Sequence, residues 1–483
     1  MKLRELLKGI DYIKIEGLQD RPVNDLHYDS RKVTPGSLFF CIKGLTVDGH
    51  DYTDQAVSKG AKTLVLERDV AIEGDVTKVF VPNSRTAMAY MARNYYKNPT
   101  KDIKLIGITG TNGKTTITYL VKSILENTGE KIGLIGTISN MIGDKIIPSR
   151  FTTPESLDLQ KLLRDMRDEK VDSMIMEVSS HSLSLGRVES CEFDIGVFSN
   201  LSQDHLDFHS SMDEYRDAKA RLFRQSKLAI INIDDENGRW IKEGVATKVY
   251  TYGIYKEADI YARDLVISHK EVTFNLHTPK GSIPIELGIP GIFSVYNALA
   301  AASVCYALGI SLESIAHGLK QVKAVNGRFE LLDTGRDYSV ILDYAHTPDG
   351  LENILKTAKE FTKARLITLF GCGGDRDQGK RPVMGEIAGK YSDLCIITSD
   401  NPRSEEPMEI IRQIQAGVEK TPCPYKIIED RRKAIEYALH NAQEGDVVIL
   451  AGKGHETYQI IGDKTIHFDE KEIVSEILGK EHI

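Results

Sequence analysis

The sequence has few features of a zinc, redox or nucleic-acid-binding protein. Its six cysteines are scattered and none forms a C-x-x-C pair, so the pattern favours neither a zinc site nor a dithiol redox site. Isolated cysteines in a long chain are typical of a reducing compartment. The formal net charge is -8 at pH 7, whereas general nucleic-acid-binding proteins are usually basic. We therefore expect no nucleic-acid partner, although a local basic pocket for a small anion is compatible with this charge.

Signs of membrane insertion or secretion are also scarce. Residues 1–5 alternate charged and apolar side chains and contain no signal-peptide core. Residues 287–312 carry no charge and are long enough for a membrane span, but Pro290, Gly291 and polar residues interrupt them and alanine dominates. We interpret this stretch as a buried helix that begins near Ser294. We therefore expect a cytoplasmic protein without a membrane span.

The arrangement of apolar runs predicts an α/β protein. The chain has no repeat of solenoid spacing and no low-complexity tract. Its length suggests about three domains. We predict a small N-terminal α/β domain over 1–100, a central P-loop domain with a parallel sheet over 101–328, and a Rossmann-like C-terminal domain over 329–483.

Strand and helix patterns alternate along all three predicted domains. The first domain has strand patterns at 37–42 and 63–66 and a helix pattern at 84–96. A strand-rich stretch covers 249–287. The parallel strands of the other two domains are predicted at 104–109, 133–138, 173–178, 195–199, 229–233, 339–342, 366–370, 394–398 and 447–450.

A glycine loop separates the strand pattern at 103–108 from a helix pattern that begins at Ile117. It consists of Gly110, Thr111, Asn112, Gly113, Lys114, Thr115 and Thr116. In such a loop, backbone N–H groups and a helix N-terminus face a phosphate. Lys114 would reach the β- and γ-phosphates, and the Thr115 hydroxyl would bind Mg²⁺. Two residues separate Gly110 from Gly113, fewer than in the general P-loop pattern. The loop predicts a nucleoside triphosphate site.

Three titratable residues follow in the central domain. Glu177 ends a strand pattern, where the ligand crevice of a parallel sheet lies, and could hold Mg²⁺ with Thr115. His205 lies in a polar loop and could be a metal ligand, whereas the aspartates of that loop could equally be structural caps. Lys219 lies on an amphipathic helix over 212–223, and this pattern alone predicts a solvent-exposed lysine.

The last third contains three polar loops that follow predicted strands, at 371–377, 400–403 and 452–456. We expect them at one edge of a sheet. Together they offer the guanidinium groups of Arg376 and Arg403 and the carboxylate of Glu456. This combination suits a zwitterionic amino acid, because Arg pairs with a carboxylate and Glu accepts an ammonium group.

These motifs, in this order and over essentially the whole chain, resemble the Mur ligases of peptidoglycan synthesis, and among them the members that add the third residue of the stem peptide. The short glycine loop is the family's own form. Ser294 departs from the pattern, since the family often has Asn there.

The resemblance implies ATP and two Mg²⁺ ions as cofactors, with Lys219 carbamylated (N-carboxylated) so that it becomes an anion. It implies a catalytic role for Lys114, Glu177, His205 and Lys219. Metal ligands would be Thr115, Glu177, His205 and Lys219. Beyond the glycine loop, ATP would contact Asn297, Arg328 and residues of the stretch 343–346, namely Asp343 and His346.

The resemblance also implies the substrates. The N-terminal domain would bind the uridine end of UDP-MurNAc-L-Ala-D-Glu through Ser30 in the stretch 29–31. The rest of this nucleotide dipeptide would contact Thr152, Thr153, Ser179 and Arg187.

The third-residue ligases differ in the amino acid that they add. Asp400, Asn401, Pro402 and Arg403 form the Asp-Asn-Pro-Arg motif associated with meso-2,6-diaminopimelate, and lysine-adding members generally lack its Arg. Arg403 and Arg376 would bind the distal carboxylate of diaminopimelate, which lysine lacks. Glu456 and the Gly452 carbonyl would accept the ammonium group.

We therefore expect a monomeric ATP-dependent amide ligase that forms an acyl phosphate and then a peptide bond to diaminopimelate. Three other interpretations are open. They are the same reaction with L-lysine, a folylpolyglutamate-synthase-like ligase, and a P-loop regulator that binds ATP without turnover.

Overall fold

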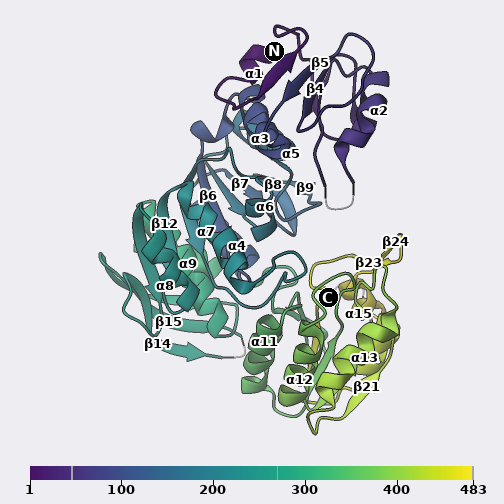
Figure 1. Ribbon diagram of the computed structural model, residues 1–483. Coiled ribbons are helices and arrows are strands. Elements are labelled where there is room, and N and C mark those ends of the chain that lie inside the picture. The colour runs from purple at the N-terminus through teal and green to yellow at the C-terminus, as the bar shows by residue number, and fades with distance from the viewer. Residues whose placement is uncertain (45–46, 269, 481–483) are drawn as a thin grey trace. The chain divides into compact units, whose positions relative to one another are not determined.

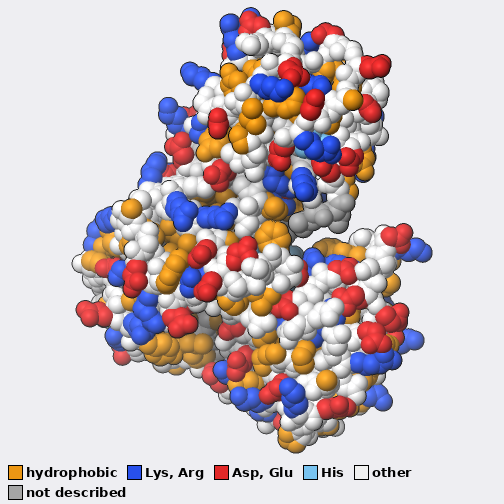
Figure 2. All heavy atoms as spheres, in the orientation of Figure 1, with side chains coloured by type: hydrophobic (Ala, Val, Ile, Leu, Met, Phe, Trp, Pro, Cys, Tyr) orange, Lys and Arg blue, Asp and Glu red, His pale blue; other side chains and the backbone are white. Residues whose placement is uncertain are grey.

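The computed structural model describes residues 1–44, 47–268 and 270–480 (Figure 1). The chain forms two units assembled from interleaved segments. Unit 1 contains Met1–Gly107, Glu130–Gly196 and Ala218–Leu228, and unit 2 contains Ile108–Gly129, Val197–Asp217 and Ala229–Ile483. On the face that Figure 2 shows, basic and acidic side chains are interspersed.

The first hundred residues of unit 1 form the predicted small α/β module. Its five-stranded sheet has the order β1-β5-β4-β3-β2. The sheet is parallel except at β1, and its strands bury apolar side chains on both faces. The elements are α1 (Leu3–Leu6), β1 (Lys14–Glu16), β2 (Leu26–His27), η1 (Ser30–Lys32), β3 (Leu38–Phe40), η2 (Gly49–Tyr52), α2 (Thr53–Ser58), β4 (Thr63–Leu66), β5 (Thr77–Phe80), α3 (Ser84–Tyr95) and η3 (Pro99–Lys101).

A second sheet has 11 strands in the order β16-β15-β14-β13-β12-β11-β6-β10-β7-β8-β9. The predicted strands of the central region are present, and β10 pairs in parallel with β7 as expected. Strand β8 is antiparallel to both of its neighbours, β7 and β9. The elements up to β12 are β6 (Lys104–Thr109), α4 (Lys114–Glu126), β7 (Ile132–Ile135), β8 (Ser139–Ile142), β9 (Lys145–Pro148), α5 (Ser156–Asp168), β10 (Ser173–Glu177), α6 (Ser180–Ser184), β11 (Phe193–Phe198), α7 (Met212–Arg224) and β12 (Ser226–Asn232).

In unit 2 the strand-rich stretch continues this sheet, and an alanine-rich helix follows it. That helix, α9, is buried along most of its length and packs against α4 and α10. It begins two residues before Ser294, so the prediction of a buried helix is confirmed. Of the helices formed by the described residues, none combines the length and the hydropathy of a membrane span. The elements are α8 (Glu236–Gly244), β13 (Lys248–Gly253), β14 (Ile260–Ile267), β15 (Val272–Thr278), β16 (Gly281–Leu287), α9 (Ile292–Ala307) and α10 (Leu312–Gln321).

The C-terminal part of unit 2 has the six-stranded sheet β17-β18-β22-β19-β20-β21. All its pairs are parallel except the edge pair β17–β18. Helices α14 and α15 pack against the apolar face of this sheet that includes Leu342 and Leu450. The elements are β17 (Glu330–Leu332), β18 (Ser339–Asp343), α11 (Pro348–Phe361), β19 (Leu366–Phe370), α12 (Lys380–Tyr391), β20 (Leu394–Ile397), α13 (Pro407–Val418), β21 (Tyr425–Ile427), α14 (Arg431–Asn441), β22 (Val447–Ala451), β23 (Tyr458–Ile461), β24 (Lys464–His467) and α15 (Glu470–Leu478).

Four predicted strands of this sheet are present as β18, β19, β20 and β22. Because these four are parallel, their carboxyl ends lie at one edge. The polar loops that follow them therefore come together there, as the sequence predicts.

Candidate active site

The glycine loop of unit 2 connects β6 to α4 and leaves no room for side chains at its two glycines. Gly110 and Gly113 have φ values of +148° and +87°. A methyl group on Gly110 would lie 1.9 Å from Ser199 Oγ, and one on Gly113 would lie 2.4 Å from Asn297 Oδ1. Asn200 holds the loop, because its carbonyl accepts from Thr111 N and its Oδ1 accepts from Asn112 N, both at 2.9 Å. The loop is thus held by Asn200, and its two glycines lie too close to Ser199 and Asn297 to carry a side chain.

We expect Gly113→Ala to raise the KM for ATP at least tenfold and to lower stability by about 1–3 kcal/mol. The added methyl meets Asn297 and must adopt a left-handed conformation. Gly129→Ala is the matched control, because Gly129 has φ +89° but nothing within 4 Å of an added methyl. It should lower the melting temperature without changing the KM for ATP. Equal changes of KM in both variants would contradict the role of the contact between Gly113 and Asn297.

Two side chains of the loop make contacts that bound phosphate would have to replace or reorder. Lys114 Nζ donates to the carbonyls of Gly110 and Thr111, each at 2.8 Å. The Thr115 hydroxyl accepts from Arg328 Nη2 at 3.0 Å. The guanidinium of Arg328 therefore already lies at the first turn of α4, with its carbon 4.6 Å from the ring centre of Tyr344.

A cavity of about 240 Å³ opens beside this loop in unit 2. One part of its wall is aromatic and aliphatic, and the other is formed by carboxamides and carboxylates. Burial raises the pKa of Asp343 and of Asp349. The predicted residues Asn297, Arg328 and Asp343 line the cavity together with Asn112, Gly113, Thr116, Asn200, Asn232, Ile289, Ile292, Phe293, Tyr296, Tyr344, Ala345, Asp349, Gly350, Asn353 and Ile354. A ligand with a planar aromatic ring and polar groups along one edge would fit this lining.

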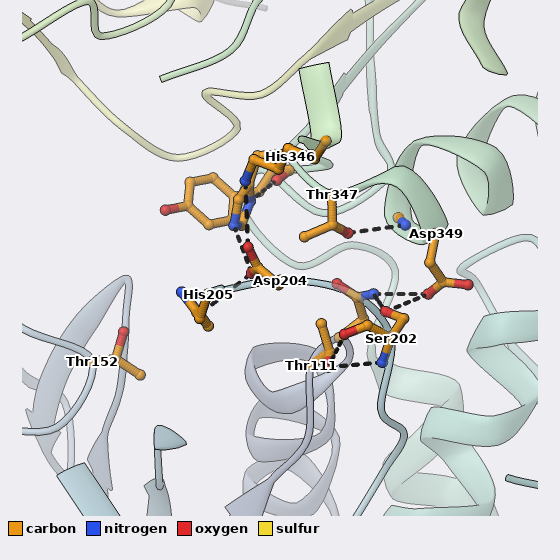
Figure 3. Close-up of polar contacts among 12 residues, drawn as sticks. Thr111, Thr152, Ser202, Asp204, His205, His346, Thr347 and Asp349 are labelled. Atoms are coloured by element: carbon orange, nitrogen blue, oxygen red, sulfur yellow. Dashed lines mark hydrogen bonds and ion pairs between the residues drawn. The ribbon is translucent and has the colours of Figure 1, made fainter. Parts of the chain in front are cut away.

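Asp204 connects His205 and His346 in unit 2 (Figure 3). Its carboxylate lies 3.3 Å from His205 Nε2, 3.8 Å from His346 Nε2 and 3.3 Å from Lys380 Nζ. Asp204 is only 4% exposed. Burial opposes its ionisation, but Lys380 and the two histidines hold its pKa well below the usual value. Burial and Lys380 lower the pKa of His346 to about 4, so that its imidazole is neutral at pH 7.

Asp349 joins the glycine loop to the start of α11 in unit 2 (Figure 3). Its Oδ2 accepts from Asn112 Nδ2 at 2.8 Å and from Ser202 Oγ at 3.4 Å. Thr347 caps α11 by accepting from Gly350 N at 3.1 Å. The loop that follows β18 is therefore tied to the glycine loop.

In unit 1, Glu177 ends β10 and the residue is 1% exposed. It accepts from Thr137 N at 2.9 Å and from Thr137 Oγ1 at 3.0 Å. A methyl on Gly136 would lie 2.4 Å from Glu177 Oε1, so this glycine makes room for the carboxylate. Thr152 Oγ1 lies 3.0 Å from Thr137 Oγ1.

The other predicted dipeptide contacts lie next to Glu177 in unit 1. Thr153 Oγ1 donates to the Glu177 carbonyl at 2.8 Å and accepts from Ser179 N at 3.1 Å. Arg187 donates to the Thr153 carbonyl at 3.0 Å and pairs with Glu155 at 2.9 Å. Unit 1 therefore brings Thr152, Thr153, Ser179 and Arg187 into one network around the end of β10.

Lys219 is 1% exposed in unit 1, so the exposed lysine expected from the helix pattern alone is wrong. The apolar residues Tyr215, Ala218, Leu222 and Phe223 of the same helix are also buried. Tyr215, Leu222 and Phe223 are three or four positions from Lys219 in the sequence, so they lie on the same side of the helix. Lys219 therefore lies on the buried side of α7. A buried position disfavours a charged ammonium group and favours a chemically altered or strongly paired one.

A second cavity in unit 1, of about 520 Å³, contains the predicted Ser30. Asp29 caps the 3₁₀ turn η1 and pairs with Arg31, while Ser30 Oγ donates to Gln55 Oε1 at 2.5 Å. The sequence did not indicate the rest of the lining, which comes from separate elements. These residues are Tyr28, Phe39, Ile42, Gly44, Val47, Gly49, Tyr52, Gln55, Arg85 and Glu155.

In the C-terminal part of unit 2, Asp400, Asn401, Gly452 and Glu456 are close together. Asn401 Nδ2 donates to Glu456 Oε2 at 2.9 Å, and a methyl on Gly452 would lie 2.8 Å from Asp400 Oδ2. Burial opposes the ionisation of Asp400, but Lys453 and Arg431 hold its pKa below the usual value. Burial and Asp400 together raise the pKa of Glu456. These loops thus form a cluster in which the carboxylates of Asp400 and Glu456 lie close to the buried cations Lys453 and Arg431.

Arg403 and Arg376 add positive charge to the same loops. Arg403 Nη1 donates to the Gly374 carbonyl at 2.8 Å, and its backbone has φ +51° and pairs with the hairpin β23–β24. Burial and the nearby Arg376 lower the pKa of Arg403. Within the part of the chain that the structure describes, neither arginine forms a salt bridge. A carboxylate ligand would therefore relieve their mutual repulsion.

Three family models match the chain. The Mur ligase middle domain matches residues 108–305, the glutamate ligase domain of Mur ligases matches 327–454, and the catalytic domain of the Mur ligase family matches 22–99. A curated relative from Caldanaerobacter subterraneus subsp. tengcongensis, named UDP-N-acetylmuramoyl-L-alanyl-D-glutamate--2,6-diaminopimelate ligase, is 55% identical over 99% of this chain and 99% of its own length. The chain belongs to the Mur ligase family. A relative of the same name from Alkaliphilus oremlandii is 52% identical over 100% of this chain and 99% of its length.

Solved structures support the Mur ligase fold. A structure with the same ligase title has a TM-score of 0.70 at 32% identity and covers 99% of both chains. A MurF crystal structure from Acinetobacter baumannii has a TM-score of 0.68 at 19% identity, also over 99% of both chains, and it supports the fold alone.

Each unit, taken by itself, contains side chains that are chemically suited to Mg²⁺. Within residues 1–44, 47–268 and 270–480, no three His, Cys, Asp or Glu side chains form a metal site by themselves. Thr115 and Glu177 offer the oxygen ligands that Mg²⁺ prefers, and a carbamate on Lys219 would add more. The residues present therefore include groups of the kind that Mg²⁺ prefers.

Proposed function

We propose that this Mur ligase uses ATP to join meso-2,6-diaminopimelate to UDP-MurNAc-L-Ala-D-Glu, and so acts in peptidoglycan synthesis. The observation that carries the proposal is the agreement between full-length relatives of that name and the placement of Arg376 and Arg403, for which the described residues provide no salt bridge. The products are ADP, phosphate and the nucleotide tripeptide.

The reaction has two stages. The side-chain carboxylate of the D-Glu residue attacks the γ-phosphorus of ATP, and the bond to the bridging oxygen breaks to release ADP. The amine of diaminopimelate, as its free base, then attacks the acyl carbon of the acyl phosphate. The new C–N bond forms, phosphate leaves, and the nitrogen loses a proton.

The glycine loop binds the transferring phosphate in this proposal. Its backbone N–H groups and the N-terminus of α4 face the phosphates. The ammonium group of Lys114 leaves the carbonyls of Gly110 and Thr111 and contacts the γ-phosphate. There it stabilises the negative charge of the phosphoryl group that is transferred. The cavity lined by Phe293, Tyr296 and Asn297 receives the adenine ring.

We propose that Thr115, Glu177, His205 and a carbamylated Lys219 hold Mg²⁺. When bound, Mg²⁺ neutralises charge on the phosphoryl oxygens. Asp204 orients the His205 imidazole through their 3.3 Å contact, and Thr137 orients the carboxylate of Glu177. The chain thus fixes its oxygen and nitrogen ligands through neighbouring side chains.

In this proposal the three domains predicted from the sequence bind different substrates or parts of them. These domains cover 1–100, 101–328 and 329–483. The ranges matched by the three family models support this division. The first domain binds the uridine end at Ser30, and Thr152, Thr153, Ser179 and Arg187 bind the sugar and peptide. The last domain binds diaminopimelate at Asp400, Asn401, Pro402, Arg403, Arg376, Gly452 and Glu456.

Purified protein tests the proposal directly. Incubated with ATP, Mg²⁺, UDP-MurNAc-L-Ala-D-Glu and diaminopimelate, it should release ADP and form the nucleotide tripeptide in equal amounts. Omission of any one component should stop ADP release. If no amino acid gives a product, the ligase proposal is wrong, and steady ATP hydrolysis without product would favour a regulator instead.

The nearest second candidate is the same reaction with L-lysine. It would leave Arg403 without a carboxylate partner, which weakens binding of lysine relative to diaminopimelate. A folylpolyglutamate-synthase-like activity is disfavoured by the N-terminal module and its cavity at Ser30.

We also propose that the protein is a monomer in the cytoplasm. ATP and UDP-linked precursors are supplied in that compartment, and one chain contains the residues proposed for all three substrates. The molar mass measured by light scattering, with and without the nucleotide dipeptide, tests whether the protein is a monomer.

A further inference from the structure

Lys453 is fully buried beside the proposed diaminopimelate site, and its ammonium group contacts atoms of the protein. Its side chain is 0% exposed. An ammonium group has three N–H donors, and Nζ of Lys453 has three acceptors. These are the Tyr458 carbonyl at 2.7 Å, Asn401 Oδ1 at 3.2 Å and Glu456 Oε2 at 3.3 Å. Its hydrogen-bonding capacity is therefore used within the protein.

These contacts decide which way the Asn401 carboxamide points. Oδ1 of Asn401 accepts from Lys453 Nζ and also from Ile460 N at 3.0 Å. A flipped amide would place its NH₂ against two donors, which a buried group tolerates poorly. Nδ2 therefore faces Glu456 Oε2, at 2.9 Å. Lys453 and Ile460 together fix Asn401 as a donor toward Glu456.

Lys453 also controls the charge of Glu456. Burial and the neighbouring Asp400 raise the pKa of Glu456, and Lys453 and Asn401 oppose this shift. The other carboxylate oxygen, Oε1, lies 3.3 Å from the Tyr344 hydroxyl and 3.5 Å from the Tyr458 hydroxyl. Without the positive charge of Lys453, two neighbouring buried carboxylates would remain, and Glu456 would take up a proton more readily.

We propose that Lys453 is a positioning residue for the amino-acid substrate, because it orients Asn401 as a donor to Glu456 and keeps Glu456 ionised, so that Glu456 can receive the ammonium group of diaminopimelate. This inference rests on the proposed function. It assigns Lys453 no contact with the substrate and no part in phosphate transfer.

Lys453→Met tests the inference, because methionine keeps an unbranched chain but has neither charge nor N–H donors. We expect the KM for diaminopimelate to rise at least tenfold, while the KM values for ATP and the nucleotide dipeptide change less than about twofold. The acidic limb of the pH profile of kcat/KM for diaminopimelate should move to higher pH, so that alkaline buffer restores part of the loss. A purely structural role would not move this limb.

A double-mutant cycle with Glu456→Gln separates the mechanism from a general loss of packing. If Lys453 acts through Glu456, then Lys453→Met should cost much less in the Glu456→Gln background than in the wild type. Fully additive losses, or an unchanged KM and pH profile in Lys453→Met, would overturn the inference. Should Lys453→Met not fold, Lys453→Gln is measured by the same criteria. A wild-type protein that forms no product with diaminopimelate would instead refute the proposed function.

Discussion

Lys219→Ala is expected to lower kcat of the ligase at least about 1,000-fold. A carbamate on this buried lysine would be an anionic Mg²⁺ ligand, and loss of metal-assisted charge neutralisation costs several kcal/mol in the transition state. The variant should still bind ATP, since the glycine loop and the cavity at Asn297 are unchanged. The measurement is the rate of ADP release with all three substrates present.

Arg224→Ala is the control for this prediction. Arg224 ends the same helix α7 but is exposed, so its loss should leave kcat within about twofold of the wild type. A ¹³C NMR spectrum in ¹³C-bicarbonate should show an added carbamate signal that is absent from Lys219→Ala. Unchanged turnover in a folded Lys219→Ala protein would refute the proposed role of Lys219.

Arg403→Ala is expected to lower kcat/KM for diaminopimelate about 100-fold, which corresponds to about 3 kcal/mol for a charge-assisted contact with the distal carboxylate. L-lysine has no such carboxylate, so its kcat/KM should change little. The ratio of the two specificity constants should therefore fall by nearly the same factor. Product formation with each amino acid, measured separately by mass spectrometry, gives both constants.

Arg412→Ala is the matched control, because this arginine of α13 is 59% exposed and pairs with Glu409 on the surface. It should leave both constants unchanged. An equal loss for diaminopimelate and lysine in Arg403→Ala would indicate that Arg403 only supports the loop, through its bond to the Gly374 carbonyl, and would contradict its proposed role in specificity.

Local patterns in the sequence predicted the fold well, because its strands are short buried apolar runs with clear limits. Strands β6, β10, β18, β19, β20 and β22 begin or end within two residues of the predicted positions. The glycine loop and helix α9 could also be predicted, since glycine spacing and alanine content are local signals. The observed ends of helices and strands differ from the predicted ends where capping and turn contacts, rather than apolar periodicity, determine them.

The candidate site was less accessible to such reasoning, because its contacts join distant parts of the chain. Asp204 pairs with Lys380, and Asn112 pairs with Asp349. No sequence pattern around Lys380 or Asp349 indicates these partners. The burial of Lys219 depends on what covers α7, so the helix pattern misjudged it and only the family resemblance pointed to its role. Lys453 was not singled out either, since a lysine in a glycine-rich loop is ordinarily exposed.

The central claim is that this ligase selects diaminopimelate. A competition assay tests it most directly, with wild-type protein, ATP, UDP-MurNAc-L-Ala-D-Glu and equal concentrations of meso-diaminopimelate and L-lysine. We predict that the diaminopimelate tripeptide exceeds the lysine tripeptide at least about 100-fold, because in the proposed site Arg376 and Arg403 would pair with a carboxylate that lysine lacks. Equal amounts of the two products, or more of the lysine tripeptide, would contradict the account.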